Sequence, residues 1–474
     1  MKLAPYTLTG GLSPDQIGLM RTRALELVES VGLHVPHARI LELLAGHDGV
    51  KVEGETVKFR PEVVENAIRE IHYPVPDYAR HEWLISAGAH QPKVHDLETG
   101  EMRESTLQDL VDLIRIGDAL DTVGSAPVVP LDVPIHLQEI QMHKVAWEHS
   151  RRRANDMFEH DPKPTVESAE YIWEMAKAAG KWFSLGLYMV SPRSFDEAEL
   201  EIIYRFLDKG VPMWAGTMPI MGVNCPITEK SGILQAMFET YACLAMLNLL
   251  NRKSYCYIQV IDSFIAHPFD MKYSTFVYGS AEDVRGTMDK LSIHKELKMP
   301  LVAKSLLTAA KQLDAQAAHE VGVHTTMAAL TGCRVFRCAG LLSSAEFYSA
   351  EKLLVDHEIV QFIRRMLEPE EFSEDTLLAE AIAEIRPGET FLEHASTFQH
   401  YRSYYWDPPL FTHSNLGQWK EMGSRSLFQC ANDRAKKLLR EHTYEIEPER
   451  KRELDRIYGV AERDEKLAKS RQIV

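Results

Sequence analysis

The chain has 474 residues, of which 45% are apolar and 26% charged, as expected for a globular protein with one large domain or a few smaller ones. Its formal net charge of −16 disfavours a nucleic-acid partner, because phosphates would be repelled. The first residues lack the apolar core of a signal peptide. Glu239 interrupts the most apolar segment, 233–250, so we expect this segment to be a buried helix and not a membrane span.

The six cysteines contain no Cys-x-x-Cys pair, and most lie in apolar or helical contexts where free buried thiols are common. A reducing, cytoplasmic location fits this usage best. The segment 319–324 begins and ends with histidine, but a spacing of five residues places the two side chains on different faces of a helix. We therefore expect no metal site belonging to the chain itself.

Residues 1–115 are expected to form an N-terminal, mostly helical extension. A capping box that begins at Ser13 predicts a helix up to about residue 30. The segments 50–59 and 93–103 are rich in β-forming residues around a central glycine turn, so each predicts a hairpin.

Between residues 116 and 370, short apolar runs alternate with helical segments. We predict strands near residues 123–129, 155–159, 182–188, 212–216, 255–261, 274–278, 301–304 and 334–338. Eight strands with helices between most of them predict an α/β fold of the (β/α)8 TIM-barrel type. An open sheet is less favoured, because the sequence contains no glycine-rich nucleotide-binding loop. Residues 371–474 predict a C-terminal capping loop followed by charged helices.

Aromatic residues stand at the ends of several predicted strands, where parallel α/β folds carry their chemistry. They are Tyr188, Trp214, Phe264, Tyr278 and Phe336. If these rings converge, they form an aromatic box that suits a quaternary ammonium group by cation–π attraction. The alternative is that each ring simply fills the core of the barrel, and for any single ring this is the commoner outcome.

Polar residues at the same edge complete the candidate binding site. Lys304 and Arg337 are candidates to hold a carboxylate, although pairing with a barrel acid such as Asp262 explains them equally well. Gln259 and His267 are further candidate polar contacts. The sequence alone assigns no catalytic residue.

A combination of segments runs nearly from end to end of the chain: 12–67, the run APVVPLD at 126–132, the turn YGSAE at 278–282, and 339–341, 349–356 and 391–419. In this combination the chain resembles the trimethylamine methyltransferase (MttB) superfamily. The resemblance implies a TIM barrel that moves a methyl group from a methylated amine to the cobalt of a corrinoid cofactor (a cobalamin) on a separate corrinoid protein.

The founding member of that superfamily carries pyrrolysine inside its barrel, whereas this sequence contains only standard residues. Relatives without pyrrolysine look like demethylases of quaternary amines, which already carry the positive charge of a good methyl donor. The resemblance therefore implies a glycine betaine:corrinoid protein methyltransferase that forms dimethylglycine.

Three alternatives remain open at this stage. In the first, the substrate is proline betaine or carnitine. In the second, the protein binds a quaternary amine without catalysis. In the third, the barrel belongs to a metal-dependent lyase or hydrolase. The last alternative needs a cluster of metal ligands that the sequence does not show. Barrels of this kind often self-associate, and the sequence leaves homo-oligomerisation open.

Overall fold

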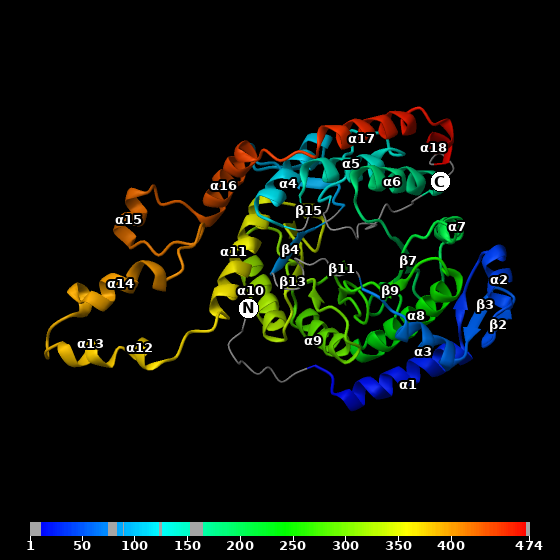
Figure 1. Cartoon of the computed structure of the whole chain (residues 1–474), viewed down its shortest axis with the longest axis horizontal. Helices are drawn as coiled ribbons and strands as arrows, with labels where there is room; N and C mark the ends of the chain where they lie inside the picture. The colour runs from blue at the N-terminus through cyan, green and yellow to red at the C-terminus, as the bar shows by residue number, and fades with distance from the viewer. Residues whose placement is uncertain (1–10, 74–82, 89, 123–125, 152–164, 471–474) are drawn as a thin grey trace.

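The computed structural model describes residues 11–73, 83–88, 90–122, 126–151 and 165–470 as a mixed α/β fold (Figure 1). Its helices are α1 (Pro14–Ser30), α2 (Ala38–Ala45), α3 (Pro61–Arg69), α4 (Leu107–Ala119), α5 (Gln138–His149), α6 (Val166–Ala179), α7 (Glu197–Phe206), α8 (Glu229–Leu250), α9 (Ala281–Glu296), α10 (Ala315–Leu330), α11 (Ala350–Met366), α12 (Glu374–Leu377), α13 (Ala379–Glu384), α14 (Ala395–Tyr404), α15 (Leu416–Glu421), α16 (Leu427–Glu441), α17 (Pro448–Ala461) and α18 (Glu465–Ser470). Its strands are β1 (Leu33–His34), β2 (Val50–Glu53), β3 (Thr56–Phe59), β4 (Leu84–Ala87), β5 (Lys93–His95), β6 (Met102–Glu104), β7 (Leu185–Met189), β8 (Met213–Thr217), β9 (Cys256–Ile258), β10 (Phe269–Asp270), β11 (Thr275–Phe276), β12 (Val302–Ala303), β13 (Val335–Ala339), β14 (Leu341–Leu342) and β15 (Phe347–Tyr348).

Two parallel three-stranded sheets form the central layer of the described part of the chain. One has the order β7-β8-β9, and the other has the order β12-β13-β4. A parallel bridge between Gln91 and Val128 follows β4. The remaining sheets are small and contain antiparallel hairpins.

Five of the predicted strands are confirmed, as β7, β8, β9, β12 and β13, with ends that differ from the prediction by one to three residues. The predicted strand at 155–159 lies outside the described residues, and of the strand predicted at 123–129 the structure shows the bridge at Val128.

The prediction of a parallel strand at 274–278 is wrong. Its residues form β11, which pairs antiparallel with β10. The reason is that β10 ends only four residues before β11 begins, and so short a connection suits a hairpin, whereas parallel strands need a crossover of roughly a dozen residues or more. The sequence analysis also missed β4, whose four residues pair with β13.

The N-terminal capping box is present, since Ser13 Oγ accepts the Gln16 N–H at 3.3 Å and Gln16 Oε1 accepts the Ser13 N–H at 2.9 Å. Both predicted hairpins are confirmed, as β2–β3 and β5–β6. Helices α1 and α3 pack against α8. Because β4 pairs with a strand of the predicted barrel, sheet hydrogen bonds join the first 115 residues to it. The division at residue 115 stays a prediction.

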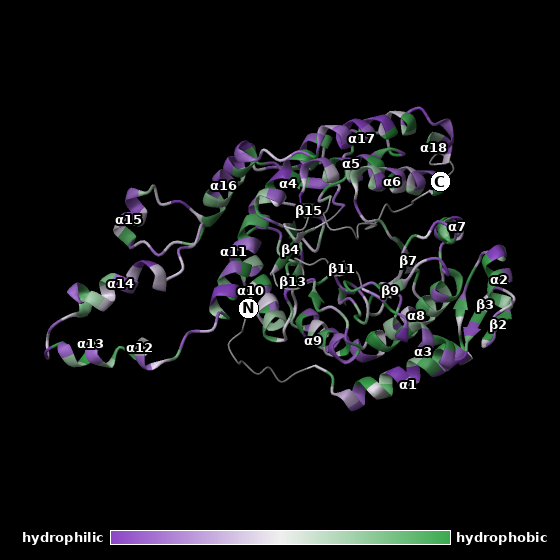
Figure 2. Ribbon diagram, in the orientation of Figure 1, coloured by the Kyte–Doolittle hydropathy of each residue, from purple (hydrophilic) through white to green (hydrophobic). Residues whose placement is uncertain are grey.

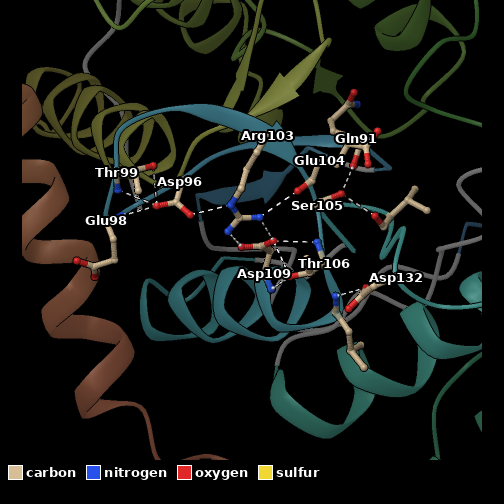
Figure 3. Close-up of polar contacts among 12 residues, drawn as sticks. Gln91, Asp96, Glu98, Thr99, Arg103, Glu104, Ser105, Thr106, Asp109 and Asp132 are labelled. Atoms are coloured by element: carbon tan, nitrogen blue, oxygen red, sulfur yellow. Dashed lines mark hydrogen bonds and ion pairs between the residues drawn. The ribbon is translucent and has the colours of Figure 1, made fainter.

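The hairpin β5–β6 is joined to α4 by charged contacts (Figure 3). The Arg103 guanidinium donates to Asp96 Oδ2 at 2.7 Å and to both carboxylate oxygens of Asp109 at 2.6 and 2.7 Å. Asp109 also accepts the N–H of Thr106, the N-cap of α4, and Ser105 Oγ donates to the Val129 carbonyl at 2.6 Å. These contacts fix the segment after β4 against the following helix.

Helix α8 is the one described helix long and apolar enough to cross a membrane by composition, and 78% of its most apolar window is buried inside the protein. It packs against β8 and against α1 and α3, which agrees with the prediction of a buried helix.

Residues 371–424, called the C-terminal arm below, project from the body of the molecule in Figure 1. The arm contains α12 to α15, and Figure 2 shows apolar residues on α13 and α15 outside the body.

Candidate active site

The central strands have two different faces. In β7, Leu185, Leu187 and Met189 belong to the apolar core that packs against helices, so Tyr188 lies on the opposite face. The same alternation in β8 places Met213 and Ala215 in the core. We call the opposite face the inner face. Its residues on these strands and just after them include Gly186, Tyr188, Trp214, Gly216, Tyr257 and Gln259.

Two aromatic rings on the inner face form a perpendicular pair. The centroids of Tyr188 and Trp214 lie 5.0 Å apart, with an interplanar angle of 88°. Glycine supplies the space for them. A Cβ atom at Gly186 would lie 2.0 Å from the Trp214 ring, and one at Gly216 would lie 3.0 Å from both rings. The sequence thus places the smallest residue opposite the largest one.

A buried ion pair lies next to these rings. Lys304, which follows β12, donates to Asp262 Oδ1 at 2.6 Å. Tyr188 Oη lies 3.4 Å from Asp262 Oδ2 and accepts a hydrogen bond from Gln259 Nε2 at 2.7 Å. Gln259 Oε1 accepts the backbone N–H groups of Ile261 and Asp262, at 2.7 and 2.6 Å. Gln259 therefore fixes the loop that carries the carboxylate.

The charges of this cluster are set by burial and by one another. Burial alone would raise the pKa of Asp262, but the Lys304 ammonium outweighs it and holds that pKa well below the ordinary value. Burial alone would lower the pKa of Lys304, but the Asp262 carboxylate raises it above its ordinary value. Burial, assisted by Lys304, lowers the pKa of His267 to about 3. At neutral pH the cluster is an ion pair beside a neutral imidazole.

His267 and Tyr278 stand in the loops beyond the strand ends. His267 Nε2 lies 3.4 Å from Asp262 Oδ1, and the imidazole ring lies edge-on to Tyr278 with centroids 5.9 Å apart. Lys304 Nζ is 5.1 Å from the centroid of the Tyr278 ring. Burial raises the pKa of Tyr278, so its phenol stays protonated. Phe276, which the sequence analysis did not select, stacks on Tyr278 at 5.2 Å.

Two of the predicted site residues lie elsewhere. Phe264 is fully buried at a left-handed backbone position (φ 61°), and its ring faces Tyr241 and His294 in the helix-packed core. Phe336 lies in the core on the outer face of β13, where its ring contacts Trp83. We correct the expectation that these two rings converge with the others. Arg337, the next residue along β13, is buried and lies on the opposite face.

The structure thus brings Tyr188, Trp214, Gln259, His267, Tyr278 and Lys304 together around Asp262. The sequence analysis treated Asp262 only as an alternative partner for a cation, and the geometry shows that it is the partner of Lys304. That these residues bind a substrate stays a prediction.

Lys290 holds the loop after β9 in place. The sequence analysis did not select it, because it stands inside a helical run. Its side chain is buried on α9 and donates to the carbonyl of Ile261 and, at 3.1 Å, to that of Val302. Burial lowers the pKa of Lys290 to about 8. The ammonium thereby joins the end of β9 to β12.

A buried carboxylate ties the ends of β7 and β8 to α8. Glu239 accepts hydrogen bonds from Ser191 Oγ at 2.6 Å, from Thr217 Oγ1 at 2.5 Å and from the Arg193 N–H at 3.0 Å. Burial raises its pKa. Within the part of the chain that the structure describes, no three His, Cys, Asp or Glu side chains gather as a metal site would require.

The sequence profile described as trimethylamine methyltransferase (MTTB) matches residues 3–468. The trimethylamine methyltransferase MttB of Methanosarcina thermophila is 26% identical over 293 residues, which are 60% of this chain and 60% of that protein. The glycine betaine methyltransferase of Desulfitobacterium hafniense strain Y51 is 22% identical over 435 residues, covering 86% of this chain and 88% of that protein. The solved monomethylamine methyltransferase MtmB of Methanosarcina barkeri covers 92% of this chain and 96% of its own, with 12% identity and a TM-score of 0.43.

Proposed function

The chain belongs to the trimethylamine methyltransferase (MTTB) family, and from this membership we propose that it removes a methyl group from a quaternary amine. Glycine betaine is the favoured donor, and dimethylglycine is then the product. The acceptor is the cobalt(I) corrinoid of a separate protein. One curated relative that aligns along most of the chain is named for glycine betaine, and its similarity supports the choice.

We further propose that the two parallel sheets belong to one eight-stranded barrel. The pairing of β13, late in the chain, with β4, early in the chain, supports this arrangement, because a barrel closes by joining its last strand to its first. Strand β4 then takes the place in the count that residues 274–278 were expected to fill. The cluster around Asp262 follows β9 and β12 at their carboxyl ends, where barrel enzymes carry their active sites.

The observation that carries the substrate class is the aromatic group beside a buried carboxylate. The rings of Tyr188, Trp214 and Tyr278 lie beside Asp262, whose charge Lys304 neutralises, so the π faces of the rings supply the attraction for a methylated ammonium ion. Lys304 and Arg337 are the candidates for the carboxylate of a betaine, and Arg337 is the one whose substitution leaves the Asp262–Lys304 pair intact. The neutral His267 adds no positive charge that would repel the ammonium group.

A quaternary amine needs no general acid from this chain. The carbon–nitrogen bond breaks, its electron pair stays on nitrogen, and the amine leaves without charge. The reduced corrinoid of the partner supplies the electron pair for the new bond to the methyl carbon. The residues of this chain hold the donor in line and keep water away. The aromatic group must not stabilise the ground-state cation more than the transition state, in which the charge disperses.

Other assignments make different predictions. Proline betaine or carnitine would keep the chemistry and need a larger space beside the aromatic pair. A non-enzymatic binder would hold betaine without loss of methyl groups. We place the protein in the cytoplasm, where a reduced corrinoid partner and free thiols both persist.

The test is a spectroscopic assay with a reduced corrinoid protein as the methyl acceptor. Each candidate amine is added separately, and conversion of the cobalt(I) spectrum to that of the methylated form is followed. Conversion with glycine betaine but not with trimethylamine is expected. Conversion only with a bulkier betaine would change the substrate, and no conversion with any quaternary amine and a competent acceptor would reject the methyltransferase.

A further inference from the structure

Lys290 is a buried cation that is bound in an unusual way. Its side chain on α9 is 1% exposed, and lysines are rarely so deeply buried unless an anion pairs with them. Within the described part of the chain, its ammonium group binds backbone carbonyls instead, those of Ile261 and Val302. Another deeply buried lysine, Lys352, follows the usual pattern, because it donates to the carboxylate of Asp356.

Both carbonyls belong to the segments that carry the buried ion pair of the candidate site. Ile261 directly precedes Asp262, and Val302 stands two residues before Lys304. The ammonium group of Lys290 therefore lies just behind the Asp262–Lys304 pair, and its charge acts on the same space.

The charges of these residues do not cancel. The Asp262 carboxylate binds Lys304 at 2.6 Å, and the neutral His267 adds no charge. Burial lowers the pKa of Lys290 to about 8, against the attraction of Asp262, so the ammonium form predominates at pH 7. Two ammonium groups and one carboxylate leave an excess of one positive charge.

The two buried acids of α9 are bound to other groups. Asp289 forms an ion pair with Lys230. Asp283 accepts the Gly279 N–H at 2.9 Å at the start of the helix, about two turns away from Lys290. The positive excess therefore remains inside the candidate site.

We propose that Lys290 determines specificity by making the site prefer amines that carry a carboxylate over amines that carry only the ammonium group. A buried excess of positive charge costs free energy until an anion joins it, and a betaine brings a carboxylate on the same molecule as its methylated nitrogen. The aromatic rings attract the ammonium group of either kind of amine, so they do not discriminate between the two. This inference rests on the proposed quaternary-amine site, and it applies to any betaine.

The first experiment measures the affinities of glycine betaine and choline by isothermal titration at pH 7, with choline in competition against betaine if it binds weakly. The ratio of the two affinities is the readout, because damage to the fold weakens both ligands alike. In Lys290→Met we expect the preference for betaine to fall about tenfold. This is the effect of one unit charge at roughly 12 Å and an effective dielectric constant of ~20.

Lys144→Met is the matched control. Lys144 is also a buried lysine, but it lies on α5, where it pairs with Glu148 and Asp455. Its substitution should lower stability and leave the ratio of the two affinities unchanged.

The second experiment follows the same ratio in the native chain from pH 7 to 9, so it does not require a variant to fold. Neither ligand titrates in this range. As Lys290 loses its proton near pH 8, the site loses its positive excess, and the preference for betaine should fall. In Lys290→Met the ratio should stay level.

Other titratable groups also act on Lys290 or feel its charge. They are Asp262, His267, His294, Lys304, His324, Cys333 and Cys338. Burial lowers the pKa of the three histidines, and it raises that of Cys333 to about 11, so these groups do not titrate between pH 7 and 9. The comparison with Lys290→Met separates Lys290 from the remaining groups.

The outcomes distinguish this inference from the proposed function. A native chain that binds neither ligand would reject the quaternary-amine site and the inference with it. A native chain that binds both ligands equally, or keeps a constant ratio from pH 7 to 9, would overturn only the role of Lys290. So would an unchanged ratio in folded Lys290→Met.

Discussion

The pairing of Lys304 with Asp262 determines how either residue responds to substitution. In Asp262→Asn the ammonium group of Lys304 loses the carboxylate that it binds, and we expect the free energy of unfolding to fall by about 3 kcal/mol. The double variant Asp262→Asn/Lys304→Met should lose less, because no buried charge is left unpaired. Urea unfolding measures both. Arg456→Met, which breaks an exposed pair with Glu453, is the control and should change stability little.

Arg337 is the residue that we expect to hold the carboxylate of a betaine. Arg337→Met should weaken betaine binding by ~1.5–3 kcal/mol, the usual contribution of a hydrogen bond to a charged group. Isothermal titration with glycine betaine measures the affinity. Choline, which has the same ammonium group and no carboxylate, is the control ligand, and its binding should not change. Equal affinity of the variant and the native chain for betaine would remove Arg337 from this role.

His267 makes stability depend on pH in a stated direction. The folded protein keeps the imidazole neutral because burial lowers its pKa to about 3, whereas the unfolded chain takes up a proton below its ordinary value of 6.5. Stability from this residue is therefore lost as the pH falls from 6.5 towards 3. Over that range, the free energy of unfolding of the native chain should fall with decreasing pH more steeply than that of His267→Gln, by ~1.4 kcal/mol per pH unit. Equal slopes for the two proteins would contradict this prediction.

Side-chain positions were predictable where strand alternation decides them. Tyr188 and Trp214 were expected at one edge and do lie in contact, because β7 and β8 pair in parallel and in register. Phe264 could not be placed, since its positive φ turns the chain and sends the ring into the core. A periodic pattern does not reveal such a reversal.

At the level of elements, the glycines of β7 and β8 make room for the inner aromatic pair. In Gly186→Ala the new methyl group would overlap the Trp214 ring, and we expect a loss of ~1–3 kcal/mol in the free energy of unfolding. Gly18→Ala is the control, because Gly18 lies within α1 with no atom within 4 Å of the added carbon. That variant should gain ~0.5–1 kcal/mol, since alanine favours a helix. Urea denaturation measures the change in the free energy of unfolding for both variants, and the two changes should have opposite signs.

Helices and their starts were read more reliably from the sequence than short strands were. Ser13 caps its predicted helix through a side-chain hydrogen bond. The strand at 274–278 was misread because β propensity does not say which strand is the partner, and its neighbour is the hairpin strand β10. Strand β4 was missed because four residues are too few to show a period.

At the scale of the whole molecule, long-range pairing was beyond the reach of the sequence. The parallel pairing of β4 with β13 joins residues about 250 positions apart, and the sequence near either strand does not encode this pairing. The projection of the C-terminal arm in Figure 1 is also not encoded locally, because the sequence predicts a capping loop at this place without saying which surface it meets.

The division at residue 115 can be tested by truncation. A chain that begins at residue 116 loses β4 from β13, and it also loses α1 and α3 from the surface of α8. We expect it to show no cooperative unfolding transition by circular dichroism, because the exposed edge and the apolar face of α8 would both need new partners.

The control deletion removes residues 371–403 and joins Glu370 to Tyr404 through two glycines. The Tyr404 hydroxyl donates to Glu370 Oε1 at 3.1 Å, so the two ends already lie side by side. This deletion takes out almost only exposed side chains, and the body should still unfold in one cooperative transition. If the chain from residue 116 unfolds cooperatively as well, the first 115 residues are a separable domain and the sheet contact through β4 is dispensable. If only the arm deletion does, the N-terminal segment is part of the folding unit, and the pairing of β4 with β13 is one of the contacts that it supplies.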